Sequence, residues 1–590
     1  MFSTLLIQSS FDEINFDSSD PIKKVIFDYD NSSSNIDIYI TNEIIPQLIE
    51  NNFSLLIIEA GLSETYTNFY GLDLAHHIRL DINLSLKRYV PIIIIYDDDP
   101  FALNKLTTRA RILFTKSIAV SKNSQIEIEN LKAKISSKSL TESLTEKNFQ
   151  VEFLDKLIIK PPNEFHHRLS NEWSVYRWSQ YLKLFDSTYV NNTKEKVSSL
   201  LYFKYLITKF PITAIEDYVE NQKKIIETKQ VKESGRVLYI DDEWDIGWKD
   251  IFEKFFRVYF STSTHVIDLK TVCKTFNSFD KEQLILDLES EVKSYDPDIV
   301  ILDMRLHNDD HKIKSTNDYS LISGVQLLDK IRKFNPGIQC IILTASNKSK
   351  LLEVLHERNI LSYIKKEDPE FYADDTANNI AKLCDDINIG LKNKYLKEIW
   401  RTAKSIETKL KLDLFNQYGL NLSDYEDNLN TLKKETEYVF DVLNSNMNNK
   451  LNYAMLSMAR SIEALQKIFI YEKSYDNPCF WDGDVVKNRT TLKDKVLSII
   501  KQKMHYIDVS DIETELEALL LNRNYYLHSN PKYKQIDPVQ LITWFNLLDQ
   551  ILEKVLNPLP RPEPKSSKPR NPNSKLKIKS KKNENVNNDQ

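Results

Sequence analysis

The stretch Asp298-Ile-Val-Ile-Leu-Asp303-Met-Arg-Leu decides the fold of the central part of this chain. Its short apolar run is typical of a buried strand, and the run ends at a carboxylate. Two other apolar runs also end in polar groups, which are Asp241 with Asp242 and Thr344, and Tyr363-Ile-Lys-Lys366 supplies an amine. The sequence therefore has four clusters of polar side chains that can take part in binding or catalysis.

The apolar runs alternate with helical stretches, which predicts a parallel sheet with crossover helices. Because the carboxyl ends of parallel strands meet at one edge of a sheet, we expect the four polar clusters to converge there. Paired carboxylates bind a hard divalent cation, and Asp303 can be both a ligand and a nucleophile. A hydroxyl and an ammonium group can bind phosphoryl oxygens. The pattern predicts a site at which a carboxylate is phosphorylated.

Over about residues 234–390 these clusters closely resemble the receiver domain of two-component response regulators. The resemblance implies a flavodoxin-like sheet, Mg²⁺ as cofactor, and a sensor histidine kinase or a phosphotransfer protein as partner. It implies phosphorylation of Asp303. The other implied roles are metal binding by Asp241, Asp242, Asp303 and the carbonyl of Arg305, and phosphoryl binding or switching by Thr344, Tyr363 and Lys366. Lys365 remains an alternative to Lys366.

The sequence departs from the family pattern just after the acceptor. His307 stands where a proline is usual, and the stretch 307–323 is longer than the family's loop. The segment between Phe260 and Tyr295 is also long. An ordinary α/β domain with carboxylates at its strand ends is the alternative interpretation.

Length and composition describe a soluble multidomain protein. The chain has 590 residues, of which 41% are hydrophobic and 28% charged, and its net charge is −6. Such a length allows several domains. Four cysteines without paired spacing indicate neither a disulfide framework nor a zinc ribbon. No apolar run approaches membrane length, so we expect no membrane segment and a cytoplasmic location.

Residues 1–125 repeat the receiver pattern without its chemistry. The run Ser54-Leu-Leu-Ile-Ile-Glu59 aligns with the strand that precedes Asp303, and a helix beginning at Gly71 follows it. Glu59 therefore stands at the acceptor position, but no acidic pair follows the first strand. We expect a degenerate receiver in which Glu59 either mimics a phosphorylated state by its charge or is simply solvated. Residues 126–230 are predicted to be a helical connecting region.

The pattern changes to helices alone after Leu391, so residues 391–556 are predicted to be a helical bundle. Ser510-Asp-Ile-Glu513 has the spacing of a capping box that starts a helix, and Pro531 prevents its continuation. Residues 557–590 are rich in proline, lysine, serine and asparagine, and we expect a disordered basic tail.

Arg523-Asn524-x3-His528 resembles the motif of HEPN-domain ribonucleases, which are helical dimers that cut RNA without a metal. The resemblance implies that His528 is general acid or base, that Arg523 holds the scissile phosphate, and that Asn524 orients the imidazole. Glu463 or Arg460 could join this site. An inactive HEPN-like bundle and an unrelated bundle are the alternatives.

Together these features predict a multidomain α/β and all-α protein in which phosphorylation of Asp303 controls a C-terminal endoribonuclease. The resemblance to HEPN ribonucleases implies a role in stress response or antiphage defence. RNA would be the substrate, and a homodimer the working form. The competing interpretation is a non-enzymatic adaptor whose helical domain binds a protein partner under the control of phosphorylation. A stand-alone receiver that shuttles phosphate is a third, which the long helical C-terminus disfavours.

Overall fold

The computed structural model describes residues 3–10, 22–29, 35–63, 68–137, 143–162, 166–184, 186–209, 233–259, 265–273, 276, 280–313, 316–345, 349–367, 369, 374–411, 416–445, 447–472, 478–486, 491–532 and 535–560. Residues 210–232 of the predicted connecting region and 561–590 of the predicted tail lie outside these ranges. The chain forms two compact units, Met1–Lys397 and Glu398–Gln590.

The first unit begins with a five-stranded parallel sheet in the order β2-β1-β3-β4-β5. The strands are β1 (Thr4–Ser9), β2 (Ile22–Phe27), β3 (Leu55–Glu59), β4 (Ile92–Ile95) and β5 (Ile118–Ser121). Its helices are α1 (Ile36–Tyr39), α2 (Ile45–Glu50), α3 (Tyr70–Leu80), α4 (Pro100–Leu106) and α5 (Gln125–Ser137), with the 3-10 segments η2 (Ile82–Tyr89) and η3 (Thr108–Phe114). The central strands are nearly all leucine and isoleucine because residues on both faces are buried.

A helical segment follows this module. It contains α6 (Phe149–Glu152), α7 (His166–Tyr181), α8 (Thr188–Ser199) and α9 (Leu201–Lys209). Helix α7 contributes to two cores, because Trp173 packs with the N-terminal module and Trp178 packs with the next one. Trp173 stacks on Phe203 of α9, whereas Trp178 makes an edge-on contact with Trp248.

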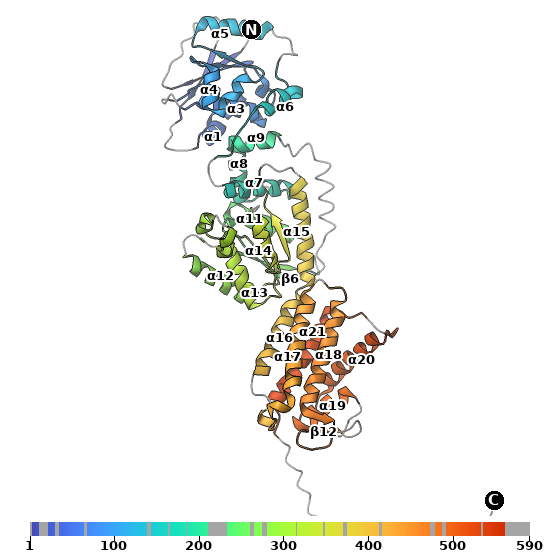
Figure 1. Ribbon diagram of the computed structural model, residues 1–590. Coiled ribbons are helices and arrows are strands. Elements are labelled where there is room, and N and C mark those ends of the chain that lie inside the picture. The colour runs from blue at the N-terminus through green and yellow to red at the C-terminus, as the bar shows by residue number, and fades with distance from the viewer. Residues whose placement is uncertain are drawn as a thin grey trace, which may run out of the picture. The chain divides into compact units, whose positions relative to one another are not determined.

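A second five-stranded parallel sheet has the order β10-β9-β8-β6-β7. Its strands are β6 (Gly235–Ile240), β7 (Ile267–Val272), β8 (Ile299–Leu302), β9 (Gln339–Thr344) and β10 (Ser362–Lys365). Its helices are α11 (Trp248–Tyr259), α12 (Lys281–Tyr295), α13 (Ser323–Phe334), α14 (Ser349–His356) and α15 (Asp374–Lys392). Alternate strand residues build two cores. Helices α11 and α15 close one face, and α12 and α13, side by side in Figure 1, close the other.

The second unit is mainly helical (Figure 1). Helix α16 (Tyr395–Lys411) is followed by α17 (Leu422–Asn444), α18 (Lys450–Phe469), α19 (Leu492–Ser498), α20 (Ser510–Leu527) and α21 (Pro538–Leu556). Helix α18 packs against α17, α20 and α21, and its apolar face is buried, as are Trp544 and Leu548 of α21. The predicted fold class, a parallel receiver-like sheet followed by a helical bundle, is confirmed.

Two details of the second unit differ from the sequence prediction. Two short antiparallel strands, β11 (Ile470–Glu472) and β12 (Pro478–Phe480), interrupt the helices. The predicted capping box is wrong, because Ser510 is the first residue of α20 and its hydroxyl donates to the Asp508 carboxylate instead. Within the described ranges, no helix is both long and apolar enough to span a bilayer.

Candidate functional site

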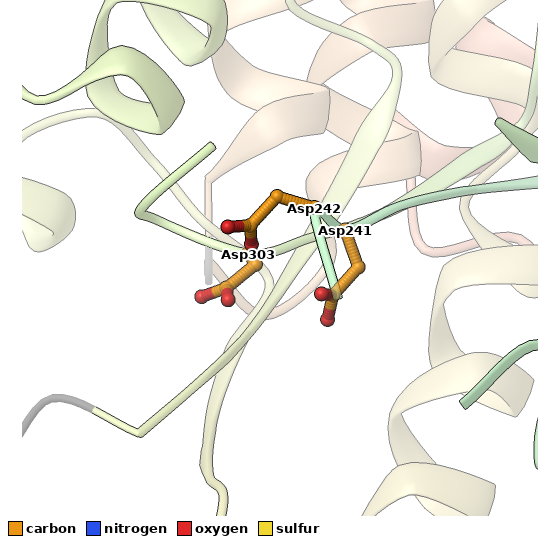
Figure 2. A group of neighbouring side chains, drawn as sticks. All are labelled: Asp241, Asp242 and Asp303. Atoms are coloured by element: carbon orange, nitrogen blue, oxygen red, sulfur yellow. The ribbon is translucent and has the colours of Figure 1, made fainter. Parts of the chain in front are cut away.

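Three aspartates meet at the carboxyl edge of the second sheet. Asp241 and Asp242 follow β6, and Asp303 follows the neighbouring strand β8, whose register places Leu302 beside Ile240. The N–H of Asp303 donates to the carbonyl of Ile240 over 3.0 Å. One carboxylate oxygen from each aspartate lies within 4.8 Å of the others (Figure 2). The parallel register thus gathers these side chains as the sequence predicts.

Lys366, directly after β10, reaches two of these carboxylates. Its Nζ lies 2.6 Å from Asp241 Oδ2 and 3.1 Å from Asp303 Oδ2, and all three side chains are fully buried. Burial alone would lower the pKa of Lys366, but the charges of Asp241 and Asp303 outweigh burial and raise it. Lys366 is therefore a buried cation held at the acceptor carboxylate, where it could bind a phosphoryl oxygen.

The acidic cluster fits a hard divalent cation. Asp241 already accepts from Tyr239 Oη at 2.7 Å and from the N–H of Glu243 at 2.8 Å. By contrast, Asp242 Oδ1 is buried without a hydrogen-bond partner in the described part of the chain. Burial and the neighbouring charges of Asp241 and Asp303 raise the pKa of Asp242 well above its usual value. Oxygen ligands with this excess negative charge match Mg²⁺, which Asp241, Asp242 and Asp303 would hold.

The remaining predicted residues surround the same edge. Thr344 is the last residue of β9 and is fully buried, and its carbonyl accepts from the N–H of Lys366 at 2.8 Å. Tyr363 lies on β10 and is half-buried; burial and the charge of Asp303 raise its pKa to about 12. Arg305 follows Asp303 by two residues, and its Nη1 lies 3.3 Å from His311 Nδ1. Thr344 thus contacts the Lys366 backbone and Tyr363 lies near Asp303, whereas metal binding by the Arg305 carbonyl stays a prediction.

Both sheets carry the same close approach between a strand end and the next helix. The N–H of Gly324 donates to the carbonyl of Met304, and that of Gly71 donates to the carbonyl of Ala60. A Cβ on Gly324 would lie 2.5 Å from the carbonyl oxygen of Asp303, and one on Gly71 would lie 1.8 Å from that of Glu59. Because neither position has room for a side chain, the alignment of Glu59 with Asp303 has a geometric basis.

The first sheet lacks the chemistry of the second. Glu59 ends β3, and its Oε2 lies 3.5 Å from the N–H of Ser9, the last residue of β1. Gln8 and Ser9 occupy the end of β1, and Ser10 follows, so no acidic pair stands beside Glu59. Among the described residues, the group of three metal-ligating side chains lies at the second sheet and has no counterpart at this edge.

Several residues at the acceptor site escaped sequence analysis. Glu243, next to the acidic pair, has a pKa raised to about 7, chiefly by burial and then by the charges of Asp241 and Asp303. Trp248 begins α11, and Lys366 Nζ lies 5.3 Å from the centre of its ring. In the sequence, only the position of Trp248, five residues after Glu243, could have indicated this contact.

Helix α7 also reaches the acceptor site. The indole N–H of Trp248 donates to Asn171 Oδ1 over 3.1 Å, and the N–H of Glu367 donates to Ser174 Oγ over 2.6 Å. Arg177 Nε lies 3.9 Å from Glu367 Oε2. The aromatic spacing of this helix predicted packing, but its polar residues gave no indication of these tertiary partners.

The HEPN-like residues lie at the end of α20. Asn524 and His528 are exposed, Arg523 is half-buried, and His528 is the C-cap residue. Arg523 Nη2 lies 4.0 Å from Glu463 Oε2 of α18, which places Glu463 beside the motif. Within the described ranges, no hydrogen bond joins the side chains of Arg523, Asn524 and His528. Arg460 pairs instead with Glu435 of α17 over 3.3 Å.

Comparison with known proteins identifies one region. Residues 8–121 match the protein family described as Inactive Receiver domain. The prediction of a receiver-like N-terminal module that lacks the acceptor chemistry is therefore confirmed. No curated protein matches the chain.

Two solved receiver structures are similar to parts of the chain. The signal receiver domain of a modulated diguanylate cyclase from Desulfovibrio desulfuricans G20 is 15% identical, covers 28% of this chain and 98% of its own, and has a TM-score of 0.19. A two-component response regulator of the LuxR family from Aurantimonas sp. SI85-9A1 is 15% identical, covers 26% of this chain and 98% of its own, and has a TM-score of 0.17.

Proposed function

We propose that Asp303 accepts a phosphoryl group and that its phosphorylation controls the C-terminal helical unit. The observation that carries the proposal is that Asp303 lies within reach of the buried Lys366 and in one cluster with Asp241 and Asp242, of which Asp242 Oδ1 has no hydrogen-bond partner among the described residues. A strand-end carboxylate with a cation and a metal-binding pair beside it suits the formation of an acyl phosphate.

The chemistry divides among few side chains. A carboxylate oxygen of Asp303 forms a P–O bond while the P–N bond to the donor's phosphohistidine breaks, and the imidazole leaves with the electron pair. Mg²⁺, when bound by Asp241 and Asp242, supplies charge neutralisation for the phosphoryl oxygens. Lys366 remains near the modified carboxylate and pairs with a phosphoryl oxygen, and the Thr344 hydroxyl donates to another.

The switch follows from this redistribution of partners. In the unmodified protein Lys366 is shared between Asp241 and Asp303. A phosphoryl group adds charge at Asp303 and draws Lys366 and Thr344 toward it, and the surface around Tyr363 changes with them. Glu367 directly follows Lys366, and its N–H donates to Ser174 Oγ of α7. A movement of Lys366 therefore changes this hydrogen bond and the position of α7.

For the helical unit we propose metal-independent RNA cleavage by a homodimer. The exposed His528 and Asn524 can reach a substrate, and Arg523 is held near Glu463. RNA carries its own 2′-hydroxyl nucleophile, so an imidazole and a guanidinium suffice for the reaction. Two copies around a twofold axis would line one cleft. A phosphorylation-controlled adaptor remains the alternative function.

Phosphoryl uptake tests the proposal for Asp303. The full-length protein is incubated with Mg²⁺ and a small phosphodonor, and uptake is followed by intact mass. We expect uptake of one phosphoryl group by the wild type and none by Asp303→Asn. Asp287→Asn, on α12, is the matched control and should behave as the wild type does. Equal uptake by Asp303→Asn would contradict the assignment.

A further inference from the structure

A pocket of about 560 Å³ lies between the N-terminal module and the helices that follow it. Its walls come from α1, α3 and η3 of the module, from the segment 158–162, and from α7, α8 and α9. This volume falls in the range of small-molecule sites. The pocket is separate from the acceptor edge of either sheet, because neither Glu59 nor Asp303 lines it.

Part of the pocket lining is apolar. Leu169, Leu200, Leu201 and Tyr202 are buried and line it, and the half-buried Ile159 adds to the apolar wall. Such a surface favours a ligand with an apolar or aromatic body, because binding removes both surfaces from water.

The charged residues of the lining are mostly cationic. Arg109, Lys160 and Lys196 line the pocket, and Asp37 is the carboxylate among its lining residues. Both oxygens of Asp37 are occupied, because Oδ1 lies 3.0 Å from His77 Nε2 and Oδ2 accepts from the N–H of Leu201 over 3.1 Å. Asp37 keeps its charge, so three cationic side chains and one carboxylate line the pocket.

Two of these cations are held in place by buried carboxylates. Arg109 Nη1 lies 2.7 Å from Asp73 Oδ2, and Lys196 Nζ lies 2.6 Å from Glu172 Oε1. Both carboxylates are 1% exposed, whereas the Arg109 and Lys196 side chains are 51% and 39% exposed. An arginine has five N–H donors, so the bond to Asp73 leaves others for a ligand. The cations are preorganised without being buried.

A histidine adds an unsatisfied polar atom to the same wall. His76 lines the pocket and is 1% exposed, and its Nε2 lies 2.9 Å from the carbonyl oxygen of Arg109. Because a carbonyl can only accept, the proton of the neutral ring lies on Nε2. Its Nδ1 has no partner among the residues that the structure describes. A buried acceptor without a donor is costly, and only a donor group, from water or from a part of the ligand other than its anionic group, can satisfy it.

We infer that this pocket binds a small amphipathic anion. Its carboxylate or phosphate group pairs with Arg109, Lys160 and Lys196, and its apolar body lies against Leu169 and Leu200. A degenerate receiver that has lost its phosphorylation chemistry would in this way respond to a metabolite instead. This inference does not depend on phosphorylation of Asp303 or on RNA cleavage.

Titration of the full-length protein with 8-anilinonaphthalene-1-sulfonate, a fluorescent aromatic anion, tests the inference. We expect saturable binding of one equivalent that weakens as salt concentration rises. Lys160→Glu should lower the affinity by about tenfold or more, because it reverses one charge of the lining. Lys105→Glu, an exposed residue of α4 outside the pocket, is the matched control and should leave the affinity unchanged.

A second variant separates filling of the pocket from loss of charge. Thr108→Trp places a large side chain on the η3 wall and should prevent binding while all three cations remain. Displacement of the probe by adenosine monophosphate would identify a phosphate ligand, and displacement by octanoate would identify a carboxylate. Equal probe affinity in the wild type, Lys160→Glu and Thr108→Trp, or no displacement by either competitor, would overturn the inference.

Discussion

The backbone N–H of Glu367 lies 2.6 Å from the hydroxyl oxygen of Ser174. Glu367 directly follows the lysine that binds the acceptor carboxylate, and Ser174 lies in the middle of α7. Both residues are buried, so the bond is shielded from water. It joins the proposed phosphorylation site to a helix that also packs into the core of the N-terminal module, through Trp173.

Ser174→Ala should weaken this connection. The variant leaves the buried N–H of Glu367 without an acceptor, and we expect its unfolding free energy to fall by about 1–3 kcal/mol. The half-life of phosphorylated Asp303 should change as well, because Lys366 is held less firmly. Thermal unfolding and the decay of the phosphorylated form measure the two effects. Ser179→Ala, whose hydroxyl donates within α7 to the Tyr176 carbonyl, should leave the half-life unchanged.

Asp242→Asn should have opposite effects with and without Mg²⁺. Without the ion, the variant removes one of three clustered carboxylates and should raise the unfolding free energy, on the order of 1 kcal/mol. Added Mg²⁺ should stabilise the wild type but not the variant. Thermal unfolding with Mg²⁺ and with chelator measures both. Equal stabilisation of the two proteins by Mg²⁺ would place the ion elsewhere.

Asp73 predicts a pH dependence of stability in the N-terminal module. Burial raises its pKa from 3.8 to about 7, against the opposing charge of Arg109. Between these values the folded state binds more protons than the unfolded state, so the carboxyl destabilises the fold increasingly as pH rises from about 4 to about 7.

Asp73→Asn removes this titration. The unfolding free energy of the variant relative to the wild type should therefore increase across that pH range, on the order of 2 kcal/mol. Chemical denaturation at several pH values measures the difference. A difference between Asp73→Asn and the wild type that does not change with pH would refute the raised pKa of Asp73.

His528→Ala tests the helical unit as a nuclease. Loss of the imidazole should lower the rate of RNA cleavage by at least about a hundredfold, because a positioned general acid or base contributes on that scale. Cleavage of labelled RNA in the presence of chelator gives the rate. His505→Asn, in the same unit, keeps a residue that tolerates the positive φ of 59° and should retain activity. Undiminished cleavage by His528→Ala would show that the active site lies elsewhere.

The sheet and the acceptor edge could be predicted because their signals are local. A buried parallel strand needs a continuous apolar run, and the polar residue that ends it must lie at the sheet's carboxyl edge. Asp241, Asp242 and Asp303 were found in this way, and the same argument placed Glu59 in the N-terminal module. Lys366 was preferred to Lys365 because of the resemblance to receiver domains.

Residues whose roles depend on tertiary partners could not be predicted. The sequence around Ser174 and Asn171 predicts a helix but not their hydrogen bonds with Glu367 and Trp248, which are distant in the chain. The predicted capping box failed for a local reason, because Ser510 has an alternative partner in the preceding Asp508. The loop after Asp303 was recognised only as long. Its buried Asp310, which bonds to Ser323 and to Lys281, depends on packing that spacing does not reveal.

The central claim is that phosphorylation of Asp303 controls the helical unit, and the most direct test is RNA cleavage by the wild type and Asp303→Asn. Each is assayed with and without a small phosphodonor and Mg²⁺. We predict that the phosphodonor changes the cleavage rate of the wild type and leaves that of Asp303→Asn unchanged. The same response in both proteins, or no cleavage by either while the wild type accepts phosphate, would contradict the account and favour an adaptor.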